Sequence, residues 1–206
     1  MPEVLFVCTG NRYRSPAAEL LLTARTGGAV RAASAGTRAV PGHGLDAATA
    51  ALVRERGGEP GAFAGTRRLT APMVARAGLV LGMETAHREA AVRLWPAALR
   101  RCFTLREFLR LSAEGTAGGA GPAGGAGLAA AVERAAARRG AAPPPPYDGD
   151  ELADPGGLSV RALRRGLAAT DTAVTALAAL LAPVVARPAG ASGAAGASGA
   201  AEVVAR

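Results

Sequence analysis

The sequence predicts an α/β fold, a three-layer sandwich with a central four-stranded parallel sheet and helices on both faces. Short apolar runs alternate along the chain with longer segments of helical spacing, which is the pattern of strand–helix units in parallel sheets. When two low-complexity segments are set aside, about 150 of the 206 residues remain, enough for one modest core.

The four expected strands are short apolar runs. The first spans residues 4–7 and leads into a Gly/Asn turn, as a buried strand of a parallel sheet would. Residues 30–33 and 79–81 are two further runs, and residues 101–104 form a fourth, weaker one.

The expected helices lie between and after these strands. Helical spacing occurs over residues 15–25, 46–56 and 84–94, and residues 70–72 have the composition of a helix start. A long helix is expected over residues 159–183, where leucine and valine side chains form one stripe.

We expect a single domain over residues 1–187, interrupted by a Gly/Ala/Pro-rich insertion at about 112–146. The middle of the insertion, residues 128–139, has the composition of a short alanine-rich helix. The composition favours a surface excursion over a lid. Residues 188–206 are a Gly/Ala/Ser stretch, for which we expect a disordered tail.

Composition and charge narrow the classes of partner. All 24 basic residues are arginine, the net charge is +8, and lysine, isoleucine and glutamine are absent, which indicates a coding bias toward G/C. The arginines are scattered and aromatic residues make up only 3 %, so nucleic acid is not the expected partner.

We expect a cytoplasmic protein that does not bind membranes. The longest apolar stretch, residues 173–186, is too short to span a bilayer and contains Pro183. The first residues lack the basic region of a secretory signal. The two cysteines, Cys8 and Cys102, give no disulfide framework and fit a reducing compartment.

The loop after the first strand has the residues for an anion site. It reads Cys8-Thr9-Gly10-Asn11-Arg12-Tyr13-Arg14-Ser15. Ligands of parallel sheets bind at the carboxyl ends of strands, where backbone N–H groups and a helix N-terminus can hold an anion. Arg14 can add a bidentate guanidinium, and the positive field favours the thiolate of Cys8, an activated nucleophile.

Each residue of this loop also has a simpler reading. Taken singly, Cys8 fits a small residue of a buried strand, Arg14 fits a surface residue and Gly10 fits a turn. Taken together, the three residues favour the anion site. Asn11 supports that site because it is the only asparagine in the chain. Asparagine tolerates left-handed backbone, and its side chain can hold neighbouring backbone in place.

Residues 7–16, Val-Cys-Thr-Gly-Asn-x-x-Arg-Ser-Pro, closely resemble the phosphate-binding loop of the low-molecular-weight protein tyrosine phosphatases. Four further segments resemble this family in the same order along the chain. They are Ser34-Ala35-Gly36-Thr37, Leu79-Val80-Leu81-Gly82-Met83 with His87-Arg88, Phe103-Thr104-Leu105-Arg106-Glu107-Phe108, and Asp150-Glu151-Leu152-Ala153-Asp154-Pro155.

The resemblance implies a flavodoxin- or Rossmann-like sandwich and a metal-independent phosphomonoesterase without a cofactor. Cys8 would attack phosphorus and form a phosphocysteine, and Arg14 would hold the phosphoryl oxygens. Asp154 would protonate the leaving oxygen and then activate water. Asp150 would cap or orient the acid loop, while His87 is more plausible as a structural residue than as a catalytic one.

The resemblance also implies how the loop is held together. Thr9, Gly10, Asn11, Arg12, Tyr13 and Ser15 would form the phosphate-binding loop with Arg14. The Ser15 hydroxyl would bond to the thiolate, and Ser34 would support Asn11. The expected partner is a phosphorylated protein or small phosphorylated molecule, the product is inorganic phosphate, and the protein would be a monomer or weak dimer.

Three departures from the family pattern bear on the substrate. Arg12 replaces the Ile or Val of many phosphotyrosine enzymes and the Thr of bacterial phosphoarginine phosphatases, which favours an acidic substrate. Gly156-Gly157 replace aromatic residues that follow the acid. Tyr13 stands where many relatives have a second cysteine, so a loop disulfide is unavailable, and the lack of resolving cysteines disfavours an arsenate reductase.

Phosphotyrosine in proteins is the leading substrate from the sequence. One alternative is phosphoarginine or a small phosphorylated metabolite. Another, from a different class, is a non-catalytic phosphate-binding regulatory module.

Overall fold

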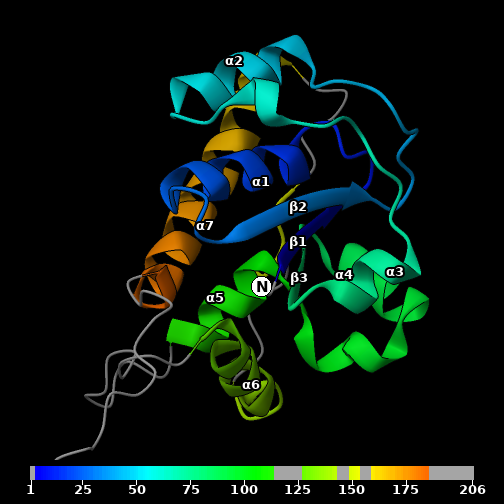
Figure 1. The fold of residues 1–206 in the computed structure, drawn as a ribbon, viewed down its shortest axis with the longest axis vertical. Helices are drawn as coiled ribbons and strands as arrows, with labels where there is room; N and C mark the ends of the chain where they lie inside the picture. The colour runs from blue at the N-terminus through cyan, green and yellow to red at the C-terminus, as the bar shows by residue number, and fades with distance from the viewer. Residues whose placement is uncertain (1–2, 114–126, 143–148, 154–158, 186–206) are drawn as a thin grey trace, which may run out of the picture.

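A computed structural model describes residues 3–113, 127–142, 149–153 and 159–185 (Figure 1). Within these residues four strands form one parallel sheet in the order β2-β1-β3-β4. They are β1 (Glu3–Cys8), β2 (Arg31–Gly36), β3 (Leu79–Gly82) and β4 (Cys102–Thr104). The predicted fold class and its four strands are therefore confirmed.

The register places the last two residues of β1 beside glycine. Cys8 at the end of β1 lies opposite Gly36 of β2, and Val7 lies opposite Gly82 of β3. β2 extends past the expected 30–33 and includes Ser34, opposite Phe6. All strands run in the same direction, so their carboxyl ends meet at one edge of the sheet.

The described chain forms seven α-helices and two short 3-10 segments. The helices are α1 (Arg14–Arg25), α2 (Ala47–Glu55), α3 (Ala71–Arg76), α4 (Thr85–Leu94), α5 (Leu105–Ala113), α6 (Leu128–Arg138) and α7 (Val160–Val185). The 3-10 segments are η1 (Pro60–Ala62) and η2 (Pro96–Arg101).

Side chains that alternate along β1 separate the two faces of the sheet. Val4 and Phe6 point to the layer that contains α1, α5, α6 and α7. Leu5 and Val7 point to the layer of α3, α4 and η2. Figure 1 shows the sheet between these two groups of helices, with α2 outside α1 and α7.

Helix α5 was not expected from the sequence. Its start is stabilised by a reciprocal cap, because Glu107 N–H donates to the Thr104 hydroxyl at 3.0 Å and the Glu107 carboxylate accepts from Thr104 N–H at 3.1 Å. This is the Thr-x-x-Glu capping box, which is visible in the sequence as Thr104-Leu105-Arg106-Glu107.

Helix α6 lies where the sequence indicated an alanine-rich helix inside the insertion. Leu128, Ala131, Val132 and Ala135 are buried in the core on the α5 side. The guanidinium of Arg139 contacts Glu107 at 2.9 Å and lies 4.1 Å over the Phe103 ring. Composition alone did not indicate this packing, because six of the eleven residues of α6 are alanine.

Residues 114–126 and 143–146 of the expected insertion and the expected tail at 188–206 lie outside the described residues, so the predicted domain limits stay predictions. In the part of the chain that is described, no helix combines the length and the apolar character that crossing a membrane requires.

Candidate active site

The candidate nucleophile lies at the carboxyl end of β1. The buried sulfur of Cys8 accepts a hydrogen bond from the Asn11 backbone N–H at 3.2 Å. The Ser15 hydroxyl oxygen lies 3.0 Å from the same sulfur. Ser15 Oγ also accepts from the Asn11 amide group at 3.0 Å, so its one hydroxyl hydrogen can be donated to the sulfur or, over the longer distance of 3.4 Å, to the Ala35 carbonyl. A thiolate at Cys8 therefore has two donors directed at it.

Asn11 holds the loop in its curved form. Its φ is 53°, the only positive value at a non-glycine position among the described residues, and its side chain is completely buried. The amide nitrogen donates to Ser15 and, at 2.8 Å, to the Ser34 hydroxyl, and the amide oxygen accepts from Arg67 N–H at 2.8 Å. One side chain thus connects the loop to α1, β2 and the segment before α3.

Ser34 links Asn11 to Glu19 of α1 through hydrogen bonds. Its hydroxyl donates to the Glu19 carboxylate at 2.5 Å, so the Asn11 amide can donate to the lone pairs of Ser34. The backbone of β2 also approaches the loop closely. A Cβ at Gly36 would lie 2.6 Å from Thr9 O and 2.8 Å from Asn11 N, so this position requires glycine.

Arg14 is the first residue of α1, and its side chain is only 2 % exposed. Its guanidinium forms an ion pair with Glu84, which directly follows β3 and Met83, and donates from Nη1 to the Leu152 carbonyl at 2.7 Å. Leu152 N–H in turn donates to the Met83 carbonyl at 2.8 Å. The loop cation is therefore oriented by two segments that lie far from it in the sequence.

Thr9 connects the loop to α4. Its hydroxyl lies 2.9 Å from His87 Nε2, and the Glu84 backbone N–H donates to His87 Nδ1 at 3.1 Å. Because Nδ1 accepts, the proton is on Nε2 and is donated to Thr9. Gly82 allows this approach, since a Cβ there would lie 2.7 Å from Arg88 N. His87 thus positions Thr9, in line with a structural role.

The remaining predicted loop residues line the outer part of the site. Gly10 and Tyr13 are half-buried, and Arg12 is exposed. A Cβ at Gly10 would meet only Arg12 Cγ, at 3.9 Å, so no backbone contact within the described chain requires this glycine. Tyr13 precedes α1 without a side-chain cap, and the N-terminus of a helix favours a bound anion.

Asp154 and Gly156-Gly157 lie outside the described residues. The segment 149–153 directly before Asp154 is described. Both carboxylate oxygens of Asp150 accept from Arg110 of α5, at 3.1 and 2.7 Å, and Glu151 accepts from Thr85 N–H at 3.3 Å. The segment is therefore attached to α5 and to the start of α4.

The second cysteine lies apart from this site. Cys102 is buried in β4, and burial raises the pKa of its thiol to about 11, against a smaller opposing effect of Arg101 and Arg139. Groups of three or more His, Cys, Asp or Glu side chains that could hold a metal do not occur among the described residues.

Sequence reasoning missed three contributors: Glu19, Glu84 and the Leu152 carbonyl. The acidic residue after strand three was visible in Met83-Glu84, directly after a recognised segment, and could have been paired with the loop arginine. Glu19 and Leu152 carried no local signal, because their contacts depend on tertiary folding.

A cysteine sulfur with converging donors lies at the end of the first strand of a parallel sheet, beside a buried arginine, which is the arrangement expected of a cysteine-dependent phosphatase site. A model of the family described as low molecular weight phosphotyrosine protein phosphatase matches residues 3–139. The chain belongs to this family of phosphate ester hydrolases, whose members use a cysteine nucleophile. The match ends before Asp154.

Two curated relatives have different names within the family. The protein-arginine-phosphatase of Geobacillus stearothermophilus is 35 % identical over 107 residues, which are 52 % of this chain and 71 % of the relative. The low molecular weight protein-tyrosine-phosphatase Etp of Escherichia coli strain K12 is 42 % identical over 85 residues, which are 41 % of this chain and 56 % of the relative.

Solved structures show the same architecture. The YwlE arginine phosphatase of Geobacillus stearothermophilus superposes with a TM-score of 0.62 at 26 % identity, covering 87 % of this chain and 92 % of that one. Wzb of Vibrio vulnificus in complex with benzylphosphonate has a TM-score of 0.62 at 21 % identity, covering 86 % of this chain and 97 % of that one, and supports the fold alone.

Proposed function

We propose that the protein removes phosphate from phosphorylated side chains of proteins, with phosphotyrosine as the leading substrate. Cys8 is the nucleophile, Arg14 the phosphate-binding cation and Asp154 the general acid and base. The observation that carries this proposal is the Cys8 sulfur, which faces the Asn11 N–H at 3.2 Å and the Ser15 hydroxyl at 3.0 Å.

In the first step the Cys8 thiolate forms a bond to phosphorus while the bond from phosphorus to the tyrosine oxygen breaks. The leaving oxygen takes a proton from Asp154, so neutral tyrosine departs and a phosphocysteine remains. Acid assistance of this kind is typically worth about 10²–10⁴-fold in rate.

In the second step water attacks the phosphocysteine and gives a proton to the Asp154 carboxylate. The bond from sulfur to phosphorus breaks, inorganic phosphate leaves, and the thiolate is restored. The Ser15 hydroxyl donates to the departing sulfur and lowers the energy of the negative charge on it.

Arg14 and the loop amides bind the phosphoryl oxygens in both steps. Arg14 is buried and already oriented by Glu84 and Leu152, so little side-chain entropy is lost when substrate binds. Preorganised donors in a site shielded from water are usually the largest electrostatic contribution to such catalysis.

The assignment of Asp154 draws support from the residues before it. Leu152, two positions earlier, donates to Met83 and accepts from Arg14 at the loop itself. An extended chain advances about 3.3 Å per residue, so a residue two positions later is within reach of the loop mouth.

Phosphoarginine is the second candidate substrate. The observation in its favour is the relative named a protein-arginine-phosphatase, 35 % identical over 71 % of its length. Arg12 is exposed at the loop mouth, where a cation disfavours a positively charged guanidinium more than a neutral phenol. We therefore keep phosphotyrosine as the leading substrate.

Turnover of p-nitrophenyl phosphate in EDTA tests the chemistry. We expect activity in the unaltered protein and none in Cys8→Ser. Asp154→Asn should lower kcat about 10²–10⁴-fold. Asp150→Asn is the matched control, because it removes a carboxylate from the same segment, and it should have a much smaller effect. An inactive unaltered protein, or full activity in Cys8→Ser, contradicts the proposal.

Two further measurements distinguish the remaining candidate substrates and functions. Rates on phosphotyrosine and phosphoarginine peptides of the same sequence decide the substrate. Acid quenching during turnover should trap phosphate on Cys8, and a trapped phosphocysteine excludes a non-catalytic phosphate-binding module.

A further inference from the structure

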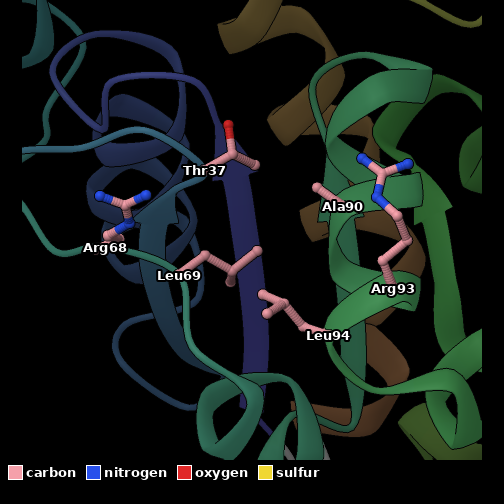
Figure 2. A pocket seen from close by; sticks show the side chains of 6 residues that line it. All are labelled: Thr37, Arg68, Leu69, Ala90, Arg93 and Leu94. Carbon is pink, nitrogen blue, oxygen red and sulfur yellow. The ribbon is translucent and has the colours of Figure 1, made fainter.

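A hollow of about 300 Å³ lies beside the catalytic loop, between α4 and the segment before α3. It is lined by Thr37, Arg68, Leu69, Ala90, Arg93 and Leu94. In Figure 2 the side chains of Leu69 and Leu94 point toward one another, while the guanidinium groups of Arg68 and Arg93 lie on opposite sides. The hollow therefore combines an apolar part with two cations and a hydroxyl.

We propose that this hollow, which we call the acidic-residue subsite, binds a glutamate or aspartate side chain near the phosphorylated residue of a protein substrate. The inference rests on the proposed function, because it concerns the same substrate. It adds a second point of recognition beside the phosphate loop.

The first wall of the subsite is connected directly to the catalytic loop. Thr37 N–H donates to the Cys8 carbonyl at 2.9 Å. Leu69 N–H donates to the Gly36 carbonyl at 2.9 Å, and Arg68 pairs with Gly36 as an isolated bridge. Because Gly36 lies opposite Cys8 in the sheet, Thr37, Arg68 and Leu69 are placed at the end of the strand that carries the nucleophile.

The second wall begins one helical turn from the loop. His87 contacts Thr9 of the loop, and Ala90 follows three positions later on α4, about 4.5 Å along the helix axis. A peptide with its phosphorylated side chain in the loop advances about 3.3 Å per residue. An acidic residue one to three positions away is therefore within reach of the subsite.

The charges of the subsite are available to a ligand. Within the described residues Arg68 is exposed and has no ion pair. Arg93 pairs with Glu89 at 3.6 Å, but both side chains are more than half exposed, and such pairs contribute little. No carboxylate lines the hollow. Exposed Arg38, whose backbone N–H donates to Thr9 O, adds positive charge nearby.

The chemistry of the lining selects the class of ligand. Leu69, Ala90 and Leu94 can cover a short aliphatic stem, and a carboxylate at its end can pair with Arg68 on one side of the hollow or with Arg93 on the other. A volume of about 300 Å³ is at the lower end of the range for ligand pockets and suits one side chain. Glutamate has this combination of stem and carboxylate.

Matched peptides test the proposal. One carries glutamate at the three positions on either side of the phosphorylated residue, and the other carries glutamine there. The phosphorylated residue is whichever of phosphotyrosine and phosphoarginine the enzyme hydrolyses faster. We expect kcat/KM to be about tenfold higher for the glutamate peptide, and we expect Arg68→Ala and Arg93→Ala each to reduce this preference about three- to fivefold, the size of a partly exposed ion pair.

Arg54→Ala is the matched control, because it removes one exposed arginine from α2, which packs on α1 and α7 away from the subsite. It should leave the preference unchanged, and none of the three variants should change turnover of p-nitrophenyl phosphate. A preference that persists in Arg68→Ala and Arg93→Ala, or that falls equally in Arg54→Ala, overturns the subsite. Inactivity of the unaltered protein on p-nitrophenyl phosphate would instead overturn the proposed function.

Discussion

Asn11 shows how one residue can determine the shape of a site. It adopts a left-handed backbone, is completely buried, and uses its amide group to hold Ser15, Ser34 and Arg67. The chain has no other asparagine, although the composition has shifted strongly away from such residues. From the conformation and the three hydrogen bonds, we expect alanine or glycine at this position to destabilise the loop.

Two substitutions of Asn11 separate these contributions. Asn11→Gly loses the hydrogen bonds but accepts the positive φ, whereas Asn11→Ala loses the bonds and adds backbone strain of about 1 kcal/mol. We expect both to reduce kcat strongly and Asn11→Ala to have the lower free energy of unfolding, measured with urea. Equal stability of the two variants would show that the left-handed backbone is not strained for alanine.

Cys102 gives a prediction about pH. Burial raises the pKa of its thiol from 9.0 to about 11, so the folded protein keeps it protonated up to about that pH. Since the thiolate is the reactive form, iodoacetamide at pH 8 should label Cys8 and spare Cys102, as read by mass spectrometry. Inorganic phosphate should protect Cys8, and urea should expose Cys102. Labelling of Cys102 in the folded protein would contradict the prediction.

At the scale of elements, Glu107 joins three parts of the fold. It caps the start of α5 with Thr104, and its carboxylate accepts from Arg88 of α4 at 3.4 Å and from Arg139 after α6 at 2.9 Å. The carboxylate is buried while the two arginines are partly exposed. This arrangement attaches α6, which has a mostly alanine surface, to the sheet.

We expect Glu107→Ala to lower the free energy of unfolding by about 2–3 kcal/mol, less than a fully buried pair because both arginines are part-exposed. Glu107→Gln keeps an acceptor for the Thr104 N–H, so its free energy of unfolding should fall less than that of Glu107→Ala. Chemical denaturation measures both values. Arg139→Ala serves as the control for the α6 contact. Its free energy of unfolding should lie between the values of the unaltered protein and of Glu107→Ala. If Glu107→Ala and the unaltered protein have the same free energy of unfolding, Glu107 does not stabilise the contacts between α4, α5 and α6.

The elements also show what the sequence can and cannot reveal. Apolar runs and helical spacing predicted all four strands and the helices α1, α2, α4 and α7 to within a few residues, because these signals are local. The capping box of α5 was equally local but was overlooked. The contacts of Arg14 with Glu84 and Leu152 join residues 70 and 138 positions apart, and no local pattern encodes them.

At the scale of the whole molecule, Asp171 connects the layer of helices behind the site. It lies on α7, forms an ion pair with Arg25 at the end of α1, and contacts Arg56 after α2 at 3.3 Å. The three helices share the cluster of Ala17, Leu20, Leu52, Val53, Leu163 and Leu167. One carboxylate therefore joins the outer helix α2 to the helices α1 and α7, and α1 directly follows the Cys8 loop.

Asp171→Asn should lower the free energy of unfolding by about 1 kcal/mol, because Asp171 and its two arginine partners are partly exposed and solvent and salt screen both ion pairs. The KM for p-nitrophenyl phosphate should not change, since Asp171 lies behind α1. The loss should shrink at 1 M salt, which a thermal unfolding series can measure. Arg164→Ala, which removes a more exposed contact with Glu55, is the matched control.

The hydrogen bond from Arg14 to Leu152 has a consequence for how the sequence can change over evolutionary time. The acceptor is a carbonyl oxygen, which every amino acid supplies. A mutation at this position can alter the packing of the side chain, but it leaves the acceptor in place. The side chains of the segment before Asp154, the proposed general acid, can therefore change among descendants of this chain while the carbonyl of residue 152 still accepts from Arg14.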